Sequence, residues 1–502
     1  MAPTTRQSKS QTSLLSQKPE TKISKKVPAV RRRNPRKLVP SFGNVEEDVL
    51  AHIFTYLPPR KLVQLSVMSK RFKETWRYCR NLVFGNDFYR RLSNRDEFVD
   101  VINHIMDSHI GEVIDSFHIL MDPTDEDKSL SRWIKKALEK GTKVLDLDFD
   151  ISLKPFAFPY VLMDSKFLRT VRLKYCIVTL PPVTTPVKGL RFLTTLVLRK
   201  VHITDFTIRR IFKNCWNLET LDMSECNGAS HISFSTHCNK RFKTLKVGNC
   251  SELFYVDVDC PTLLSLHYSG TLQGLRILNN PRTSKLDDVM LNFEAPRTGI
   301  TPHYLVERLL THNISTVSVL TITSTVLEGA TARMRNGVFA SLNLCLWNLK
   351  ELQVFMDNTS FCNGVDIADF VGKCPRLEKL FVDINNVNFA GDLYWQLHQK
   401  PFIDTFSTVF QNLKVMKVKG FKFLGQEIEM VRLFLRRSFQ MEEMILVYPK
   451  NKDQIIHDIE PSNDAVFSGL FQNWKASPKV QILVRENSSD KTISAKHLRK
   501  WY

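Results

Sequence analysis

One apolar motif recurs along most of this 502-residue chain, and it constrains the fold more than any other feature of the sequence. The motif is Leu-x-x-Leu-x-Leu with conservative replacements, and five successive copies begin at Leu168, Leu193, Leu218, Phe242 and Leu263. Their starts are 25, 25, 24 and 21 residues apart. Alternate side chains of a strand point to one face, so each copy predicts a short strand with one apolar face, followed by a return segment.

Further copies extend the array in both directions. The later ones are Leu286/Val289/Leu291, Ile314/Val317/Val319, Leu349/Leu352/Val354, Leu377/Leu380/Val382, Leu413/Met416/Val418 and Met441/Met444/Leu446, and the earlier ones are Ile114/Phe117/Ile119 and Leu145/Leu147. The spacing is typical of leucine-rich repeats. We therefore expect an α/β solenoid in which a curved parallel sheet has helices and irregular returns on its outer side.

Six of the ten cysteines follow the period of the repeats. Three lie eight residues after the first apolar position of a copy, and three lie three residues before it: Cys176, Cys226 and Cys250, then Cys215, Cys260 and Cys374. The chain has no Cys-x-x-Cys pair, which zinc sites commonly use. These cysteines are therefore expected to pack in the core, and no metal or other cofactor is predicted.

Residues 41–80 have a helical pattern instead. Their apolar residues recur at helical spacing, first in Val49, Leu50, Ile53, Phe54 and Leu57, then in Leu62 and Leu65, and last in Phe72 and Trp76. Pro58 and Pro59 end the first helix, because proline lacks the backbone donor that a helix requires. Three short helices are predicted.

The stretch from Val45-Glu-Glu-Asp-Val-Leu-Ala-His-Ile-Phe-Thr-Tyr-Leu-Pro58 through Leu62–Phe72 to Trp76 resembles an F-box. The resemblance implies docking on a Skp-type adaptor, and through it on cullin and RING subunits. The implied contact residues are Val45, Val49, Leu50, Ile53, Phe54, Leu57, Pro58, Leu62, Leu65, Phe72 and Trp76. F-boxes usually open with Leu-Pro, so Val45-Glu46 predicts weaker docking. The alternative is a helical cap on the solenoid.

Two other stretches carry a second resemblance. Residues 115–185 are similar to plant F-box/leucine-rich-repeat proteins, and Leu413 to Leu446 resembles their C-terminal FBD region, a strand–helix–strand unit that would close the array. The expected domains are a disordered basic tail (1–37), the F-box (41–80), a helical linker (81–110), the repeats (111–407), an FBD-like cap (408–450) and an extension with a possible last strand (451–502).

The tail carries half of the net charge of +20, with eleven Lys/Arg and one acid in residues 1–37. Its densest cluster, Arg31, Arg32, Arg33, Arg36 and Lys37, suits a nuclear import receptor. Contact with a nucleic-acid backbone and no specific role are the alternatives. No secretory signal or membrane-spanning run is expected, so the predicted location is the nucleus, the cytoplasm or both.

Four basic residues lie between apolar positions of the early repeats, which places them on the predicted concave face: Arg172, Lys174, Arg199 and Lys246. They predict a basic patch for an acidic or phosphorylated segment of a protein substrate. An ordinary solvated face is the alternative, and a small polyphosphate is a further ligand that such a patch could hold.

Catalytic motifs are missing, including the P-loop, the dinucleotide-binding glycines, H-E-x-x-H and G-x-S-x-G. The resemblance therefore implies a non-catalytic substrate receptor of a Skp–cullin–F-box ubiquitin ligase, without membrane or nucleic-acid partners. Two alternatives remain open: a small-molecule-gated receptor of the same architecture, and a repeat scaffold or nucleic-acid binder without ligase activity.

Overall fold

The computed structural model describes most of residues 49–497. The residues outside the description are 1–48, 50–51, 55, 58–60, 62–63, 65–66, 68–73, 91, 93, 182–186, 236–238, 272–273, 279–283, 294–302, 332, 336–337, 341–343, 357–361, 388, 390–394, 451–468, 470 and 498–502. Within the described residues, no helix combines the length and apolar character that a membrane crossing requires.

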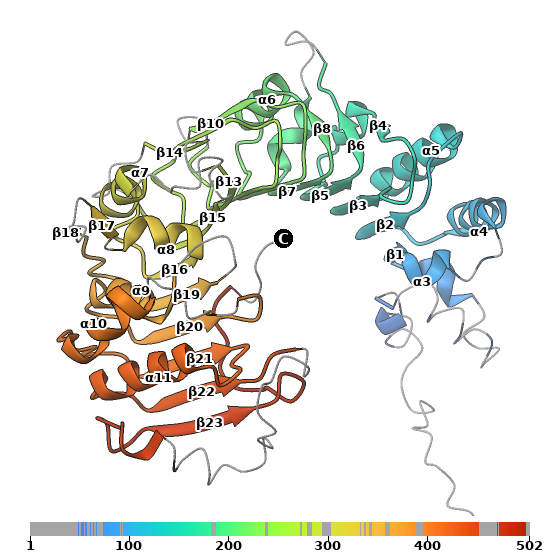
Figure 1. Cartoon of the computed structure of the whole chain (residues 1–502). Coiled ribbons are helices and arrows are strands. Elements are labelled where there is room, and N and C mark those ends of the chain that lie inside the picture. The colour runs from blue at the N-terminus through green and yellow to red at the C-terminus, as the bar shows by residue number, and fades with distance from the viewer. Residues whose placement is uncertain are drawn as a thin grey trace, which may run out of the picture. The chain divides into compact units, whose positions relative to one another are not determined.

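One parallel sheet runs through the described part of the chain, with fifteen strands that follow each other in chain order (Figure 1). The strands are β1 (Asn81–Phe84), β2 (Ser116–Leu120), β3 (Val144–Asp148), β5 (Thr170–Lys174), β7 (Thr195–Arg199), β9 (Thr220–Ser224), β11 (Thr244–Gly248), β13 (Ser265–Gly270), β15 (Asp288–Phe293), β16 (Val319–Thr323), β19 (Glu351–Phe355), β20 (Lys379–Asp383), β21 (Val415–Lys419), β22 (Glu443–Val447) and β23 (Gln481–Arg485). This is the predicted α/β repeat architecture.

The helices lie on one side of this sheet (Figure 1). The α-helices are α3 (Asn86–Tyr89), α4 (Arg95–Ser108), α5 (Asp127–Glu139), α6 (Asp205–Asn214), α7 (His303–Arg308), α8 (Ser324–Ala330), α9 (Gly364–Gly372), α10 (Lys400–Thr405) and α11 (Gly425–Arg437). Shorter 3₁₀ and π turns are η3 (Thr75–Tyr78), η4 (Tyr160–Met163), η5 (Lys188–Phe192), η7 (Leu309–Asn313) and η8 (Trp395–Gln399).

Some returns are built from short strands instead. They form a three-stranded parallel sheet of β4 (Phe156–Phe158), β6 (Cys176–Val178) and β8 (His202–Ile203) and a second one of β10 (His231–Ser235), β12 (Tyr255–Asp259) and β14 (Leu275–Ile277). An antiparallel pair joins β17 (Arg333–Arg335) to β18 (Val338–Ala340). Strand returns need fewer residues than helical ones, which fits the short spacings of the early repeats.

The apolar positions of the motif form the core. Leu145, Val171, Leu196, Leu221 and Leu245 are cross-strand neighbours on β3 to β11, and each is at most 2% exposed. Each repeat therefore buries its apolar row against the rows before and after it.

One predicted copy, Ile314/Val317/Val319, has the wrong register. Strand β16 begins at Val319, and its inward residues are Leu320 and Ile322, so the copy reads Val317/Leu320/Ile322. Ile314 is buried, but it ends the η7 turn instead of opening the motif. Apolar residues three apart are found both in a buried turn and before a strand, which explains the error.

Two predicted boundaries also change. Residues 81–110 are not only a helical linker, because β1 pairs with β2 and is the first strand of the sheet. The FBD-like region has the expected order of β21, α11 and β22, but it does not close the array, since β23 pairs with β22 beyond it. The possible last strand that the sequence predicts within residues 451–502 is present as β23. Strand β1 lies outside the period, and an isolated four-residue strand is hard to recognise until a neighbour pairs with it.

Strands β5, β7, β9 and β11 end in the same unusual backbone turn. Tyr175, Lys200, Glu225 and Asn249 directly follow β5, β7, β9 and β11, and all four have φ between 52° and 58°. The backbone N–H of each donates to a carbonyl at the end of the next strand, at 2.9–3.3 Å, and the acceptor is the last residue of that strand except for Asn249, which donates to Ser269. This ladder offsets the cost of a left-handed conformation in a residue other than glycine.

The cysteines of the period pack as predicted. Cys176, Cys215, Cys226, Cys260 and Cys374 are buried and Cys250 is half-buried. The thiols of Cys176, Cys226 and Cys250 each donate to the carbonyl two residues earlier, at 3.4–3.5 Å. Each cysteine thus fills the bend that follows a left-handed residue.

Glu427 gives a test of this packing through pH. Its carboxylate accepts the Lys422 N–H at 2.6 Å and is fully buried, and burial outweighs these bonds and raises the pKa of Glu427 to about 7. A carboxyl whose pKa is higher in the folded state loses stability as pH rises from the unfolded value, 4.5, through about 7. Glu427→Gln removes the charge, so we expect the stability of the variant relative to the parent to increase from pH 5 to pH 8 by up to about 3 kcal/mol. The measurement is the Tm of both proteins at the two pH values.

Glu378→Gln, which alters an exposed ion pair with Lys414, is the control for this comparison. It is expected to show no such pH dependence. A Glu427→Gln protein whose Tm relative to the parent is the same at pH 5 and pH 8 would contradict the assignment.

Candidate functional site

The face of the sheet away from the helices is the candidate site, and we call it the open face. Its middle row, in strand order, is His118, Asp146, Arg172, Val197, Asp222, Lys246, His267, Met290, Thr321, Gln353, Phe381, Lys417, Ile445 and Leu483. The first five are half-buried or exposed, whereas every residue from His267 to Ile445 is buried. The open face therefore has an accessible N-terminal half and a covered C-terminal half.

The accessible half carries the four predicted basic residues, but it is not a basic patch. Arg172 lies 3.9 Å from Asp146, Arg199 lies 3.1 Å from Asp222, and Lys174 lies within 3.3 Å of both Asp148 and Asp150. Lys246 lies two strands away from Arg199, with Asp222 between them in the middle row.

The prediction of a basic patch is therefore corrected to a face of paired charges. Each motif copy, taken alone, shows its basic residues, but the partner acids come from the neighbouring copy. The ion pairs lie across the strands, so the charge balance depends on the register between copies. The acids also weaken the electrostatic reason to expect a polyphosphate here.

Asp222 is the most buried of the acids that pair with these basic residues. Its Oδ1 atom has no hydrogen-bond partner in the described structure, and burial raises the pKa of the Asp222 carboxyl although the Arg199 guanidinium opposes the shift. The Arg199–Asp222 pair thus leaves one buried carboxylate oxygen that can accept a further hydrogen bond.

The chain's own C-terminal segment, residues 486–497, covers the other half. After β23 it returns across the sheet, and Asp490 lies 2.6 Å from the Lys417 ammonium of β21. Lys417 also donates to Thr492 Oγ1 at 2.8 Å and to the Ile493 carbonyl at 2.9 Å. The Lys417 side chain is fully buried, and its ammonium group is held by acceptors of the C-terminal segment.

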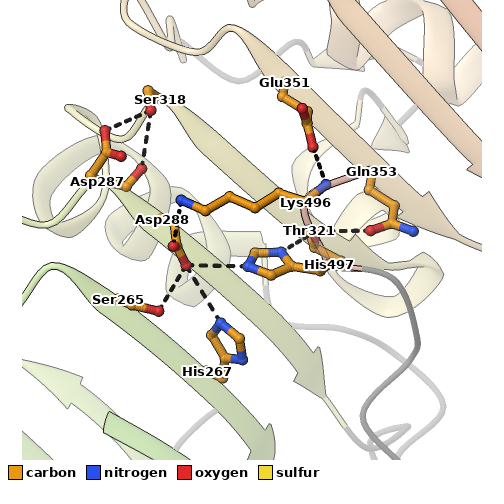
Figure 2. Close-up of polar contacts among 10 residues, drawn as sticks. All are labelled: Ser265, His267, Asp287, Asp288, Ser318, Thr321, Glu351, Gln353, Lys496 and His497. Atoms are coloured by element: carbon orange, nitrogen blue, oxygen red, sulfur yellow. Dashed lines mark hydrogen bonds and ion pairs between the residues drawn. The ribbon is translucent and has the colours of Figure 1, made fainter. Parts of the chain in front are cut away.

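The segment then reaches β19, β16 and β15 (Figure 2). The Lys496 N–H donates to Glu351 at 2.6 Å, and the Lys496 ammonium lies 2.7 Å from Asp288. His497 contacts Thr321 through Nδ1 at 2.7 Å and Asp288 through Nε2 at 3.2 Å. The C-terminal segment is therefore held by charge on at least three strands.

These contacts shift the protonation of the carboxylates. Burial opposes ionisation, but the bonds from His267, His497, Lys496 and Ser265 together hold the pKa of Asp288 well below its usual range. Lys417 and Thr492 likewise lower the pKa of Asp490. Both aspartates are therefore charged at neutral pH. Sequence reasoning missed this segment because 209 residues separate Asp288 from His497.

At the other end of the sheet, the described residues of the predicted adaptor site divide into two groups. Val49 and Ile53 are about half exposed, at 47% and 51%, whereas Phe54 is buried at 5% and Leu57 and Trp76 are half-buried. Six predicted contact residues, Val45, Leu50, Pro58, Leu62, Leu65 and Phe72, lie outside the described residues, as do Arg31, Arg32, Arg33, Arg36 and Lys37.

The helical motif joins the sheet through backbone acceptors. Cys79 Sγ donates to the Leu57 carbonyl at 3.2 Å, and Asn81 of β1 donates to the Tyr56 carbonyl at 3.4 Å. Arg80 donates to the Tyr56 hydroxyl at 3.1 Å. Strand β1 thus carries the motif directly at the first edge of the sheet.

Comparison with known proteins agrees with both parts of this architecture. The family model described as the At1g61320/AtMIF1 LRR domain matches residues 105–481, and the F-box domain model matches residues 46–84. The chain belongs to the plant F-box/leucine-rich-repeat proteins with an FBD-like region.

Two Arabidopsis thaliana members of this family match nearly the whole chain. At1g61330, whose name places it among the FBD-associated F-box proteins, is 30% identical over 440 residues, which cover 86% of this chain and 96% of that protein. The FBD-associated F-box protein At1g61320 is 29% identical over 454 residues, which cover 89% and 96%. The similarity of this F-box protein to both therefore extends over most of each chain.

Replacing Lys417 tests how the C-terminal segment is held. Lys417→Ala leaves the Asp490 carboxylate without its buried partner, at a cost of about 3–5 kcal/mol. We expect trypsin to cleave the full-length variant at Lys491 and Lys496 much faster than it cleaves the parent.

Lys414→Ala is the matched control, because Lys414 forms an exposed pair with Glu378 and such a pair contributes about 1 kcal/mol at most. Equal cleavage of the Lys417→Ala protein and the parent would contradict the docking described above.

Proposed function

We propose that this F-box protein is the substrate-recognition subunit of a Skp–cullin–F-box ubiquitin ligase. The F-box match at residues 46–84, together with the exposed apolar side chain of Ile53, carries the proposal. An exposed apolar surface of this kind is typical of a region that a partner covers. F-box domains generally bind Skp-type adaptors, so the adaptor is the expected partner.

The exposed fractions of two neighbouring residues of the motif suggest different roles for them. Phe54 is buried within this chain alone, so its side chain has little exposed area to offer a partner. Ile53 is exposed beside it and can contribute its area to an adaptor without any change in the chain's own core. The sequence pattern places both on one stripe and does not distinguish them.

The accessible half of the open face is the proposed site for a target protein. Its paired charges favour a target segment with acidic and basic side chains, which would exchange partners with Arg172, Arg199 and Asp222. The chain need not perform chemistry in this role. It contributes by raising the effective concentration of the target's lysines near the loaded conjugating enzyme.

We also propose nuclear entry through Arg31, Arg32, Arg33, Arg36 and Lys37. These residues supply a dense run of cations, which an acidic receptor groove can bind. Fusing residues 1–37 to a fluorescent protein is expected to concentrate it in plant nuclei. Replacing the five residues by alanine should return the fusion to a uniform distribution, and unchanged accumulation would exclude this cluster.

Ile53→Asp tests adaptor docking. A carboxylate at the centre of an apolar contact must be desolvated, so we expect adaptor affinity to fall more than about 100-fold, or about 2.8 kcal/mol. The measurement is calorimetric titration of the full-length chain with the Skp-type adaptor, followed by ubiquitin transfer in the reconstituted complex.

Leu153→Asp is the matched control, because Leu153 is 92% exposed and lies outside the F-box. It should bind like the parent. The ligase proposal fails if the parent does not bind the adaptor, or if Ile53→Asp binds as well as the parent does.

A further inference from the structure

Two histidines and one aspartate converge beneath the C-terminal segment. His267 comes from β13, Asp288 from β15 and His497 from the segment itself, and their ligand atoms all lie within 4.8 Å of one another (Figure 2). The three side chains are 9%, 11% and 6% exposed. Two imidazoles with one carboxylate are a common ligand set for zinc.

The distances in this cluster are long for charge-assisted hydrogen bonds and match the spacing of ligand atoms around one metal ion. His497 Nε2 and His267 Nε2 lie 3.2 and 3.4 Å from the same oxygen, Asp288 Oδ1. A charge-assisted bond between imidazolium and carboxylate is usually about 2.7–2.9 Å long. Zinc bonds of about 2.0–2.1 Å at tetrahedral angles instead separate neighbouring ligand atoms by about 3.3 Å.

The surrounding bonds also orient His497 as a ligand. The Thr321 hydroxyl donates to Gln353 Oε1 at 3.3 Å, so its oxygen can accept the Nδ1 proton of His497 at 2.7 Å. A proton on Nδ1 directs the lone pair of Nε2 toward Asp288. Such a partner on the outer nitrogen is the usual support of a metal-binding histidine.

The aspartate is held in the same manner. Ser265 donates to Asp288 Oδ1 at 2.9 Å, and Lys496 binds the other oxygen, Oδ2, at 2.7 Å. The carboxylate is thus fixed with Oδ1 facing both imidazoles. Lys496 repels a metal ion, but its side chain is 45% exposed and can turn toward solvent.

We propose that His267, Asp288 and His497 form a zinc site that fastens the C-terminal segment to the open face. Two ligands come from the sheet and the third from the segment, so the ion would cross-link residues 209 apart in the chain. Ser265 Oγ or a water molecule supplies the fourth ligand. The role is structural, since the site is buried and the segment that the ion would hold covers half of the open face.

Cobalt(II) is the probe, because it takes the place of zinc and its visible absorption reports four-coordinate geometry. We expect the metal-stripped full-length parent to bind one equivalent of Co²⁺ with these bands, and Zn²⁺ to displace it. His267→Ala and His497→Ala should each weaken binding more than about 100-fold. Zn²⁺ should also raise the Tm of the parent but not of His497→Ala.

Two further variants separate a zinc site from a metal-free ion-pair cluster. His231→Ala removes a histidine that lies 2.9 Å from Asp257 in a pair with no second imidazole, and it should bind Co²⁺ like the parent. Lys496→Gln removes the competing cation, so it should bind Co²⁺ more tightly than the parent and keep its segment protected from proteolysis when Zn²⁺ is present.

The proposal is overturned if the parent shows no four-coordinate Co²⁺ bands, or if binding is the same in His267→Ala, His497→Ala and His231→Ala. It is also overturned if Lys496→Gln releases the segment whether or not Zn²⁺ is present. His497 lies outside the strands of the sheet, so His497→Ala should not disturb folding. It therefore keeps the test valid if His267→Ala does not fold. None of these readouts depends on adaptor binding.

Discussion

The hydrogen-bonded ladder between parallel strands is the constraint on which the rest of this structure depends. Each repeat has one apolar row that it cannot bury alone, and the ladder places that row against the equivalent rows of its neighbours. The same register places the polar rows side by side on the open face. Packing on one side of the sheet and the arrangement of polar side chains on the other are therefore fixed by one set of backbone bonds.

The two ends of the ladder are completed differently. At the N-terminal edge, β1 pairs with β2 and carries the F-box through the bonds of Cys79, Arg80 and Asn81. At the C-terminal edge, β23 pairs with β22, and the chain then turns back over the open face. An unpaired edge strand invites association with other chains, and the returning segment leaves from this last edge.

Much of this could be predicted from the sequence because the repeat is local. A strand, its apolar row and its period are readable within 25 residues, and the buried cysteines follow the same period. What the sequence does not show is how separate copies face each other. The acids that neutralise Arg172 and Arg199, the partners of Lys417 and the meeting of His267 with His497 all depend on spacing across the sheet. The error at Ile314 has the same origin, since a local pattern fits two registers and only the neighbouring strands select one.

The chain's own C-terminal segment covers half of the open face. Without that segment, Lys417 would project into solvent from the middle of the open face. Lysine-reactive labelling of the native full-length protein, read by mass spectrometry, measures this directly. We expect Lys417 to react far more slowly than the exposed Lys414 in the native protein, and both to react equally after denaturation. Equal labelling of Lys417 and Lys414 in the native protein would contradict the claim.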